Sequence, residues 1–292
     1  MKRGKSRRLF KKKKSHSNQR LGCIIAIIVL IPICYGLYLY YQQYSVQHSS
    51  KPQIETSVSL PTPSGKDLEI PVSLIPRCEQ IIRHKGYTVS YNKGLNIPNW
   101  FSYDLTRQET KGKEKRGDNF IADPLVKGAI ATNADYARSG YDKGHMAPAA
   151  DMKWSPDVMK ESFYFSNMCP QHPQLNRRGW KNLEEKIRDW AVADSAIIII
   201  CGPIIDKPSK TIGKNKVAVP ERFFKVILSP FVKPARGIGF LFNNRQAVEP
   251  LPTYAVSIDS IEKHTHMDFF SPLPDEIENA VEANADYYQW PR

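Results

Sequence analysis

A run of 21 residues without a charged side chain, 21–41, divides this chain more sharply than any other feature of its sequence. The run is rich in Ile and Leu and ends on Tyr38, Tyr40 and Tyr41. A helix of this length, rising about 1.5 Å per residue, reaches about 30 Å, the thickness of the hydrocarbon core of a bilayer. Tyrosine is also enriched where a span meets the membrane surface. The run therefore predicts a single transmembrane helix that anchors the protein in membrane lipid.

The segment before this run, residues 1–20, carries ten Lys or Arg and no acidic residue. Because positive flanks stay in the cytoplasm, this basic tail predicts a cytoplasmic N-terminus and a periplasmic or extracellular remainder. A cleaved signal peptide and a buried core helix are the alternatives for residues 21–41. The run is longer than the apolar region of a signal peptide, about 7–15 residues, and no small-x-small cleavage motif follows it, which favours a retained anchor.

The basic tail also indicates which membrane holds the anchor. Its lysine clusters and its weak amphipathic periodicity favour a bacterial plasma membrane. The mitochondrial inner membrane is the alternative.

Residues 42–67 are polar and rich in Ser, Thr and Pro, which is typical of a flexible linker. Residues 68–292 are then long enough to form one domain with its own hydrophobic core. The whole chain has a net charge of +13, and removing the ten cations of the tail leaves +3. Composition alone is therefore no argument for a nucleic-acid surface. Local basic clusters are candidates for steering a substrate, or else solvated loops and helix faces: Lys111, Lys113, Lys115 and Arg116, or Arg177 and Arg178.

Strand-like and helical patterns alternate irregularly along this domain. Apolar residues at helical spacing, from Trp180 through Leu183 and Ile187 to Trp190 and Ala191, predict a helix with one face packed on a sheet. Strands are predicted at residues 87–92, 196–203, 223–228, 237–242 and 254–258. The expected fold class is α+β, with a mixed or antiparallel sheet flanked by helices.

The residues with the clearest chemistry are Asp142-Lys143-Gly144-His145, followed by Asn176 and Glu184. An imidazole that titrates near neutrality can take a proton from water, and a lysine can contact a phosphate. Amide and carboxylate oxygens suit a hard metal ion. Eight residues along a helix turn by about 80° and rise about 12 Å, so we expect Asn176 to bind an ion directly and Glu184 to act through a water ligand. The pattern predicts metal-assisted hydrolysis of phosphodiesters.

These segments resemble the DNA/RNA non-specific endonucleases of the ββα-metal superfamily. The family signature is Asp-Arg-Gly-His, then a metal-binding Asn and, eight residues later, a Glu; this order and spacing match here. The resemblance covers roughly residues 87–273, and one departure is Lys143, where the family has arginine. Further matching segments are Gly144-His145-x-Ala147-Pro148, residues 165–171, and Leu175-Asn176 to Leu183-Glu184.

The resemblance implies a ββα-metal core and a metal-dependent, sugar-non-specific endonuclease that cleaves DNA, RNA or both to 5′-phosphate ends. His145 would be the general base and Lys143 a phosphate contact. Asn176 would bind one Mg²⁺, or alternatively Mn²⁺ or Ca²⁺, and Glu184 would orient the water ligands of the ion. A second arginine for the transition state is expected from Arg107, Arg116 or Arg138. No obligate protein partner is implied.

A catalytically silent nucleic-acid-binding or DNA-uptake module on the membrane is the alternative function. The presence of His145, Asn176 and Glu184 favours an enzyme, because binding alone needs no general base.

For several polar residues the sequence allows two interpretations. Asp142 either orients a catalytic neighbour or caps the turn before Gly144, and the second is favoured. Asn167 either contacts the metal region or satisfies backbone groups of a loop. His264 and His266 could place two ligands on one strand face, although such a pair is usually solvated or structural.

Cysteine usage leaves one disulfide open among Cys78, Cys169 and Cys201. No Cys or His spacing indicates a zinc site.

Overall fold

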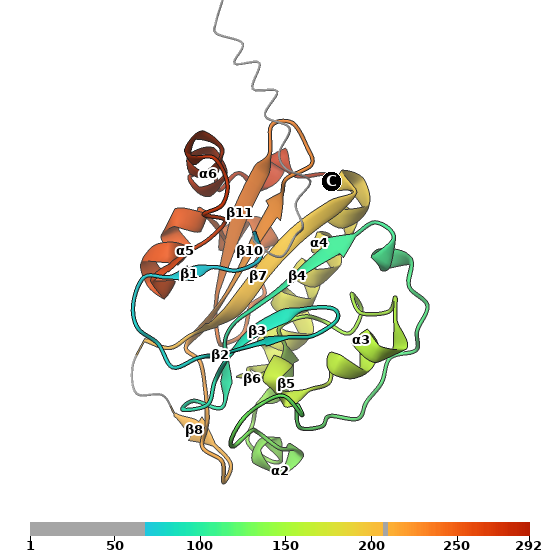
Figure 1. Ribbon diagram of the computed structural model, residues 1–292, viewed down its shortest axis with the longest axis vertical. Helices are drawn as coiled ribbons and strands as arrows, with labels where there is room; N and C mark the ends of the chain where they lie inside the picture. Colours follow the sequence, from blue (N-terminus) through green and yellow to red (C-terminus); the bar gives the residue numbers. More distant parts are fainter. Residues whose placement is uncertain (1–67, 207–209) are drawn as a thin grey trace, which may run out of the picture. The chain divides into compact units, whose positions relative to one another are not determined.

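The computed structural model describes residues 68–206 and 210–292 (Figure 1). The basic tail, the transmembrane helix and the linker predicted for residues 1–67 lie outside the described residues. Within the described residues, no helix is long and apolar enough to cross a membrane.

Seven strands form a central sheet in which every neighbouring pair is antiparallel. This confirms the predicted α+β class, with an antiparallel sheet. In spatial order the strands are β12 (Ala255–Val256), β11 (Arg236–Asn243), β10 (Arg222–Ser229), β7 (Ala196–Ile204), β4 (Ile97–Thr106), β3 (Thr88–Asn92) and β2 (Gln80–Arg83).

Short sheets and helices surround the central sheet. The two-stranded sheets pair β1 (Val72–Ser73) with β13 (Met267–Asp268), β5 (Asp142–His145) with β6 (Met168–Gln171), and β8 (Thr211–Ile212) with β9 (Val217–Ala218). The α-helices are α2 (Asn133–Tyr136), α3 (Pro156–Glu161), α4 (Lys181–Asp194), α5 (Ile258–Thr265) and α6 (Asp275–Glu282). The 3-10 turns are η1 (Glu109–Lys111), η2 (Phe165–Asn167), η4 (Leu251–Tyr254) and η5 (Tyr287–Gln289), and η3 (Leu175–Trp180) is a π-helical turn.

Strand β7 lies in the middle of the sheet, hydrogen-bonded to β4 and β10. Its Ile197 to Cys201 segment is buried on both faces. A strand covered on both faces is a continuous apolar run, whereas a strand with one solvated face alternates. This explains the sequence AIIIICGPI.

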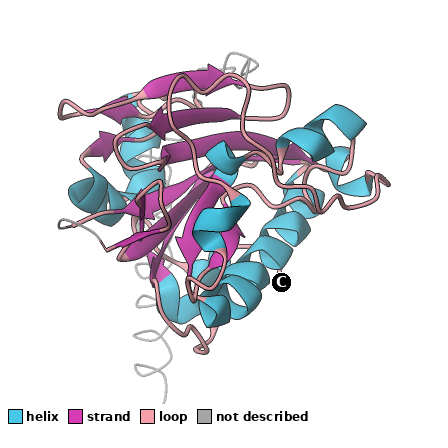
Figure 2. Ribbon diagram, turned by 90° about the horizontal axis from the view of Figure 1, so that it is seen from below, coloured by secondary structure: helices cyan, strands magenta, loops and turns pink. Residues whose placement is uncertain are grey.

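Helices cover both faces of the sheet (Figure 2). On one face, Trp190 of α4 stacks on Phe240 of β11, with ring centroids 6.2 Å apart. On the other face, β11 presents Gly239, where an added Cβ would come within 2.6 Å of Ile261 Cδ1 in α5. Glycine is therefore needed at this position for α5 to pack closely on the sheet.

All of the chain between the neighbouring strands β4 and β7, residues 107–195, leaves the central sheet. This excursion contains β5, β6, η3 and α4 in that order. β5 and β6 pair antiparallel and the helix follows them, so two strands and a helix come together on the α4 face.

Most of the predicted elements are confirmed. The strands predicted at 87–92, 196–203, 223–228 and 237–242 are β3, β7, β10 and β11, and the predicted amphipathic helix is α4. The strand predicted at 254–258 is wrong apart from the two residues of β12. Ser257 caps a helix there, because its side chain accepts from the Ser260 backbone N–H, and Ile258, Ile261 and Thr265 are buried at helical spacing.

Candidate active site

A cavity of about 640 Å³ opens beside β5 and α4. It brings together the four site residues predicted from the sequence: Lys143 and His145 from β5, Asn176 from η3 and Glu184 from α4. The rest of its lining comprises Arg116, Phe120, Asp142, Pro148, Ala149, Ala150, Arg177, Lys181, Glu185 and Arg188.

The pairing of β5 with β6 fixes the position of His145. Gly144 lies opposite Cys169, and an added Cβ on Gly144 would collide with the buried side chain of Gln171. Only glycine allows this close approach. The carbonyl oxygen of His145 accepts a hydrogen bond from Trp180 Nε1 at 3.1 Å, which ties the strand to the start of α4.

Asn167 holds the backbone that follows His145. Its Oδ1 accepts from the backbone N–H groups of Met146 at 3.2 Å and Ala147 at 2.9 Å. Its Nδ2 donates to the carbonyl oxygens of Ala147 and Ser162. Of its two interpretations, the structure therefore supports the one in which Asn167 satisfies backbone groups.

The imidazole of His145 is 8% exposed and packs against two aromatic edges, with ring centroids 5.6 Å from Phe120 and 5.2 Å from Phe163. Its Nε2 is buried and has no hydrogen-bond partner among the described residues. Burial, and then the positive charges of Arg116 and Lys143, lower the pKa of His145 to about 3. The ring is therefore neutral at neutral pH, as a group that accepts a proton must be.

Asn176 lies in the π-helical turn η3, and its amide is oriented by Asp142. Asn176 Nδ2 donates to Asp142 Oδ2 at 3.0 Å, which leaves the amide oxygen Oδ1 for a ligand. Arg177 donates to both oxygens of the same carboxylate, from Nε to Oδ2 and from Nη2 to Oδ1, each at 2.8 Å. The preference for Asp142 as a turn cap is wrong, because Asp142 lies in a strand and its carboxylate orients a residue of the cavity.

Glu184 lies on α4 near three charged residues that the sequence did not indicate as part of the site: Lys225, Asp151 and Arg188. Burial raises the pKa of Glu184 to about 7, against the opposing influence of Lys225. Lys225 is fully buried; its Nζ donates to the Met146 carbonyl at 3.3 Å and lies 4.4 Å from the Trp180 ring. The available signal was Lys225, a cation in the interior of the otherwise apolar segment FFKVIL.

Asp151 and Arg188 complete this group. Arg188 Nη1 donates to Asp151 Oδ1 at 2.8 Å, and Tyr103 donates to Oδ2 at 2.9 Å. Asp151 is 1% exposed, so its charge depends on these partners.

Two cations face the cavity from the side of Phe120. Lys143 Nζ donates to Asn133 Oδ1 at 2.8 Å and lies 4.1 Å from the Phe120 ring centroid. Arg116 lies over Phe163, 5.5 Å from its centroid. Of the three arginines considered for the transition state, Arg116 lines the cavity, whereas Arg107 donates to the carbonyls of Val192 and Ala193 in α4. Arg138 is not among the lining residues.

The oxygens available to a metal ion in this cavity are few. Asn176 offers an amide oxygen and Glu184 a carboxylate, and neither of the two groupings of three potential ligands found among residues 68–206 and 210–292 involves the cavity. Such a sparse set fits Mg²⁺, which dehydrates reluctantly and keeps several waters.

The remaining candidate residues lie elsewhere. Cys78, Cys169 and Cys201 are free thiols, so none of the three forms the disulfide that the sequence left open. His264 lies in the last turn of α5 and His266 is its C-cap, so the two do not share a strand face.

Comparison with known proteins gives a consistent result. A family model described as DNA/RNA non-specific endonuclease matches residues 64–276. A nuclease from Nostoc sp. is 30% identical over 80% of this chain and 88% of its own length. Human mitochondrial endonuclease G is 33% identical over 65% of this chain and 69% of its own. A crystal structure of the EndoG/EndoGI complex contains a chain that superposes with a TM-score of 0.63 at 28% identity, covering 68% of this chain and 89% of that one.

Proposed function

The chain belongs to the DNA/RNA non-specific endonuclease family and is an endonuclease, and from that premise we propose that it hydrolyses phosphodiester bonds of DNA, RNA or both to 5′-phosphate ends with His145 as general base and one divalent ion. The observation that carries the proposal is the convergence of a neutral histidine, two cations and two metal-type oxygens on one cavity. We take β5, β6 and α4 as the ββα-metal core. Since the lining residues engage phosphate and metal, the site has no need to read bases.

His145 would remove a proton from the attacking water. Its low pKa keeps the ring neutral, but the nearby positive charges of Arg116 and Lys143 also make it a weak base. A phosphodiester anion bound between these cations would offset their charge and raise the proton affinity of the imidazole. Substrate binding would thus bring the base closer to the pKa that proton transfer requires.

Asn176 and Glu184 would hold the ion, Asn176 through Oδ1 and Glu184 through a water ligand. The ion, Mg²⁺ or alternatively Mn²⁺ or Ca²⁺, would supply Lewis-acid stabilisation of the charge that develops on the phosphate and the leaving 3′ oxygen. Asp142 supports this assignment, because it accepts from Asn176 Nδ2 and so turns Oδ1 outward as a ligand.

Lys143 and Arg116 would contact phosphate oxygens, and Arg116 is our choice for the transition-state arginine. A lysine is a compact point charge, whereas a guanidinium can make two parallel hydrogen bonds. Since lysine replaces the arginine of the family signature at position 143, we expect Arg116 to be the bidentate partner of the phosphate here.

Incubation of the full chain with supercoiled plasmid, and separately with RNA, tests the proposal. We expect cleavage in Mg²⁺, none with a chelator, and fragments whose 5′ ends accept labelled phosphate only after phosphatase treatment. Cleavage that persists in the chelator would refute the metal-dependent mechanism. Binding without cleavage would restore the silent nucleic-acid-binding alternative.

We also propose that residues 21–41 anchor the enzyme in a bacterial plasma membrane with the nuclease domain outside. The support is the uncharged run and the ten cations before it. Protease added to intact spheroplasts should digest the domain, and alkaline carbonate should not extract the chain from membranes. Protection from external protease would reverse the proposed orientation.

A further inference from the structure

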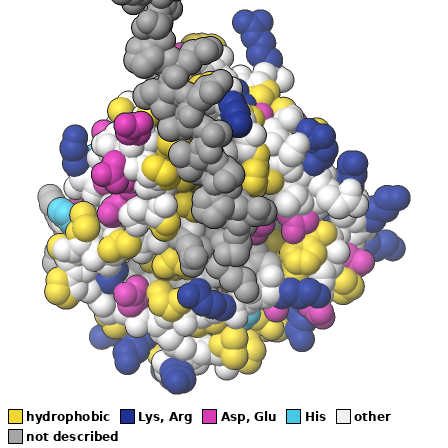
Figure 3. Space-filling model, turned by 45° about the horizontal axis from the view of Figure 1, so that its top comes forward, with side chains coloured by type: hydrophobic (Ala, Val, Ile, Leu, Met, Phe, Trp, Pro, Cys, Tyr) yellow, Lys and Arg dark blue, Asp and Glu magenta, His cyan; other side chains and the backbone are white. Residues whose placement is uncertain are grey.

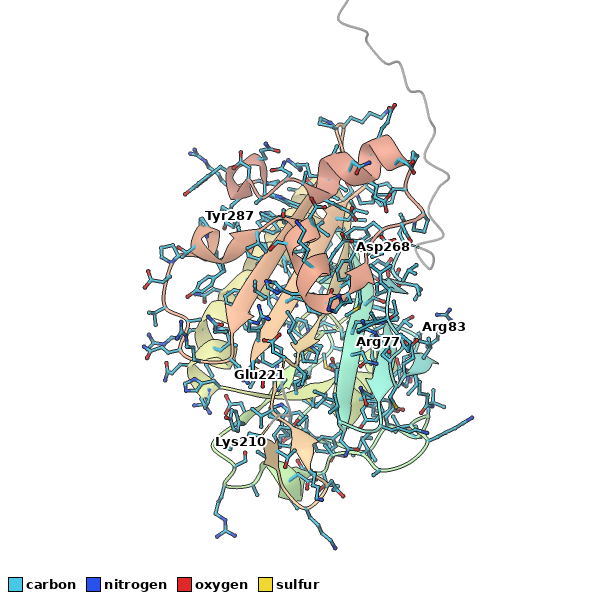
Figure 4. The ribbon with its side chains drawn as sticks, turned by 90° about the vertical axis from the view of Figure 1, so that its left-hand side faces the viewer. Arg77, Arg83, Lys210, Glu221, Asp268 and Tyr287 are labelled. Carbon is cyan, nitrogen blue, oxygen red and sulfur yellow. The ribbon has the colours of Figure 1, made fainter. Side chains whose placement is uncertain are left out.

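Five acidic side chains gather on the face of the sheet opposite α4. They come from two helices and a short strand: Asp259 and Glu262 from α5, Asp268 from β13, and Glu278 and Glu282 from α6. Figure 3 shows acidic side chains collected over this part of the molecule, and Figure 4 shows Asp268 beside the two C-terminal helices.

The packing of α5 and α6 on β11 creates this cluster. Glycines on β11 allow both helices to approach closely: an added Cβ on Gly239 would lie 2.6 Å from Ile261 of α5, and one on Gly237 would lie 2.9 Å from Cβ of Val281 in α6. Residues three or four apart share one side of a helix. The acidic pairs 259/262 and 278/282 therefore form one edge of each helix.

The distances among the carboxylates suit a shared ligand. Carboxylate oxygens of Asp259, Glu262 and Glu282 all lie within 4.8 Å of one another, and so do those of Asp268, Glu278 and Glu282. Calcium binds oxygen at about 2.3–2.6 Å, so oxygens on opposite sides of one ion are about 5 Å apart. Glu282 belongs to both groups and is the centre of the cluster.

Glu282 is 6% exposed, and its Oε1 is buried without a hydrogen-bond partner among the residues that the structure describes. Within the same residues, none of the five carboxylates forms an ion pair with Lys, Arg or His. Burial, and then the charges of Glu262 and Glu278, raise the pKa of Glu282 to about 8. A buried acidic group without a cation must be neutralised by a proton or by an ion from solution.

We propose that this cluster is a second divalent-cation site, of calcium type and separate from the catalytic cavity, which joins α5 and α6 to β13. Either group of three carboxylates that includes Glu282 offers the oxygen ligands that Ca²⁺ takes, with water in the remaining positions. Ca²⁺ accepts such an irregular set more readily than Mg²⁺, which demands a near-ideal octahedron. Ion binding would stabilise the C-terminal helices against the mutual repulsion of their acidic edges.

Thermal unfolding of the chelator-treated full chain, titrated with CaCl₂ or MgCl₂, tests the site. The Asn176→Ala background weakens the contribution of the catalytic cavity. We expect Ca²⁺ to raise Tm by about 5 °C at saturation and Mg²⁺ to raise it less. Glu282→Gln and Glu278→Gln should lose the calcium response. The matched control Glu276→Gln changes an exposed carboxylate of the same helix and should keep it.

Three results would overturn the site: no response to Ca²⁺ in the Asn176→Ala background, an equal response in Glu282→Gln and Glu278→Gln, or loss of the response in Glu276→Gln. Plasmid cleavage in Mg²⁺ should be unchanged in both cluster variants, so the nuclease proposal and this proposal fail independently.

Discussion

The catalytic cavity and the acidic cluster lie on opposite faces of one sheet, and they differ in whether their carboxylates have basic neighbours. Each carboxylate that lines the cavity has a basic neighbour: Asp142 binds Arg177 at 2.8 Å, Glu185 lies 3.4 Å from Lys181, and Glu184 lies in the field of Lys225. The five carboxylates of the cluster have no ion pair among the described residues.

This difference shows which ligand each region can receive. In the cavity, neither Lys143 nor Arg116 has a carboxylate partner among residues 68–206 and 210–292, so both cations can attract a phosphate. In the cluster, like charges that follow one another at helical spacing destabilise each helix by tenths of a kcal/mol per pair unless a cation offsets them. The carboxylates of the cavity are offset by basic residues of the same chain, and the cavity can receive an anion. The carboxylates of the acidic cluster need a proton or a cation from solution.

Loss of the proposed general base should produce the largest effect, and it should change the catalytic cavity without changing the acidic cluster. His145→Ala should reduce turnover by about 100-fold or more, because proton transfer from water loses its acceptor. The calcium response of the cluster should persist. Turnover of plasmid and circular dichroism measure activity and fold, with His264→Ala as the control. Near-wild-type turnover in the folded variant would exclude His145 as the base.

Removal of the proposed direct ligand should have the next largest effect. Asn176→Ala should reduce activity at low Mg²⁺ by about tenfold or more and shift the Mg²⁺ requirement upward, since one of few protein oxygens is lost. Glu184→Ala should show a milder form. Initial rates across a Mg²⁺ titration measure the shift, and Asn182→Ala, an exposed residue of α4, is the control. Titration curves that overlay the wild type would place the ion elsewhere.

The contribution of Lys143 to nucleic-acid binding should appear in the salt dependence of the affinity. Lys143→Ala should bind nucleic acid more weakly and reduce the slope of log affinity against log salt by about 0.7–0.9, as expected for one lost phosphate contact. Lys143→Arg should stay active, because it keeps the charge and adds a second donor. Lys263→Ala removes a charge on α5 and serves as the control. An alanine variant with wild-type slope and rate would make Lys143 a solvated residue.

The acidic cluster should give the smallest effect, in stability and not in activity. Because the pKa of Glu282 is raised from 4.5 to about 8, the folded state retains a proton between these values that the unfolded state releases. Metal-free wild type should therefore lose stability as pH rises from about 4.5 to about 8 and change little above. Glu282→Gln should flatten this dependence, as measured by Tm at each pH. Parallel profiles would mean that Glu282 carries no such proton.

The residues of the candidate site that lie within single short segments of the chain could be proposed from the sequence, and the structure brings them to one cavity. His145, Asn176 and Glu184 could be found because the catalytic motif and the spacing from 176 to 184 lie within single segments. The strands around Ile199 and Phe240 were predictable since burial leaves an apolar pattern that a single strand carries by itself.

Features that arise from packing between distant segments could not be predicted. Phe120 and Phe163, which hold the His145 ring, and Lys225, which lies beneath Glu184, reach the site through tertiary contacts without any fixed spacing. The strand predicted at 254–258 failed for a related reason. A short apolar pattern fits a strand or a helix start equally well, and the cap provided by Ser257 decided between them.

The excursion between β4 and β7 has a consequence for when this enzyme becomes active during its own synthesis and folding. Every proposed catalytic residue lies within residues 107–195, and the strands that bracket this segment are joined by pairs such as Thr106 with Ala196. Closing a loop of about 90 residues carries a large entropic cost, so neighbouring hairpins such as β10 with β11 form more readily. We therefore expect the local hairpins of the sheet to form before β4 pairs with β7, and nuclease activity, which needs the residues of this segment in place, to appear after them.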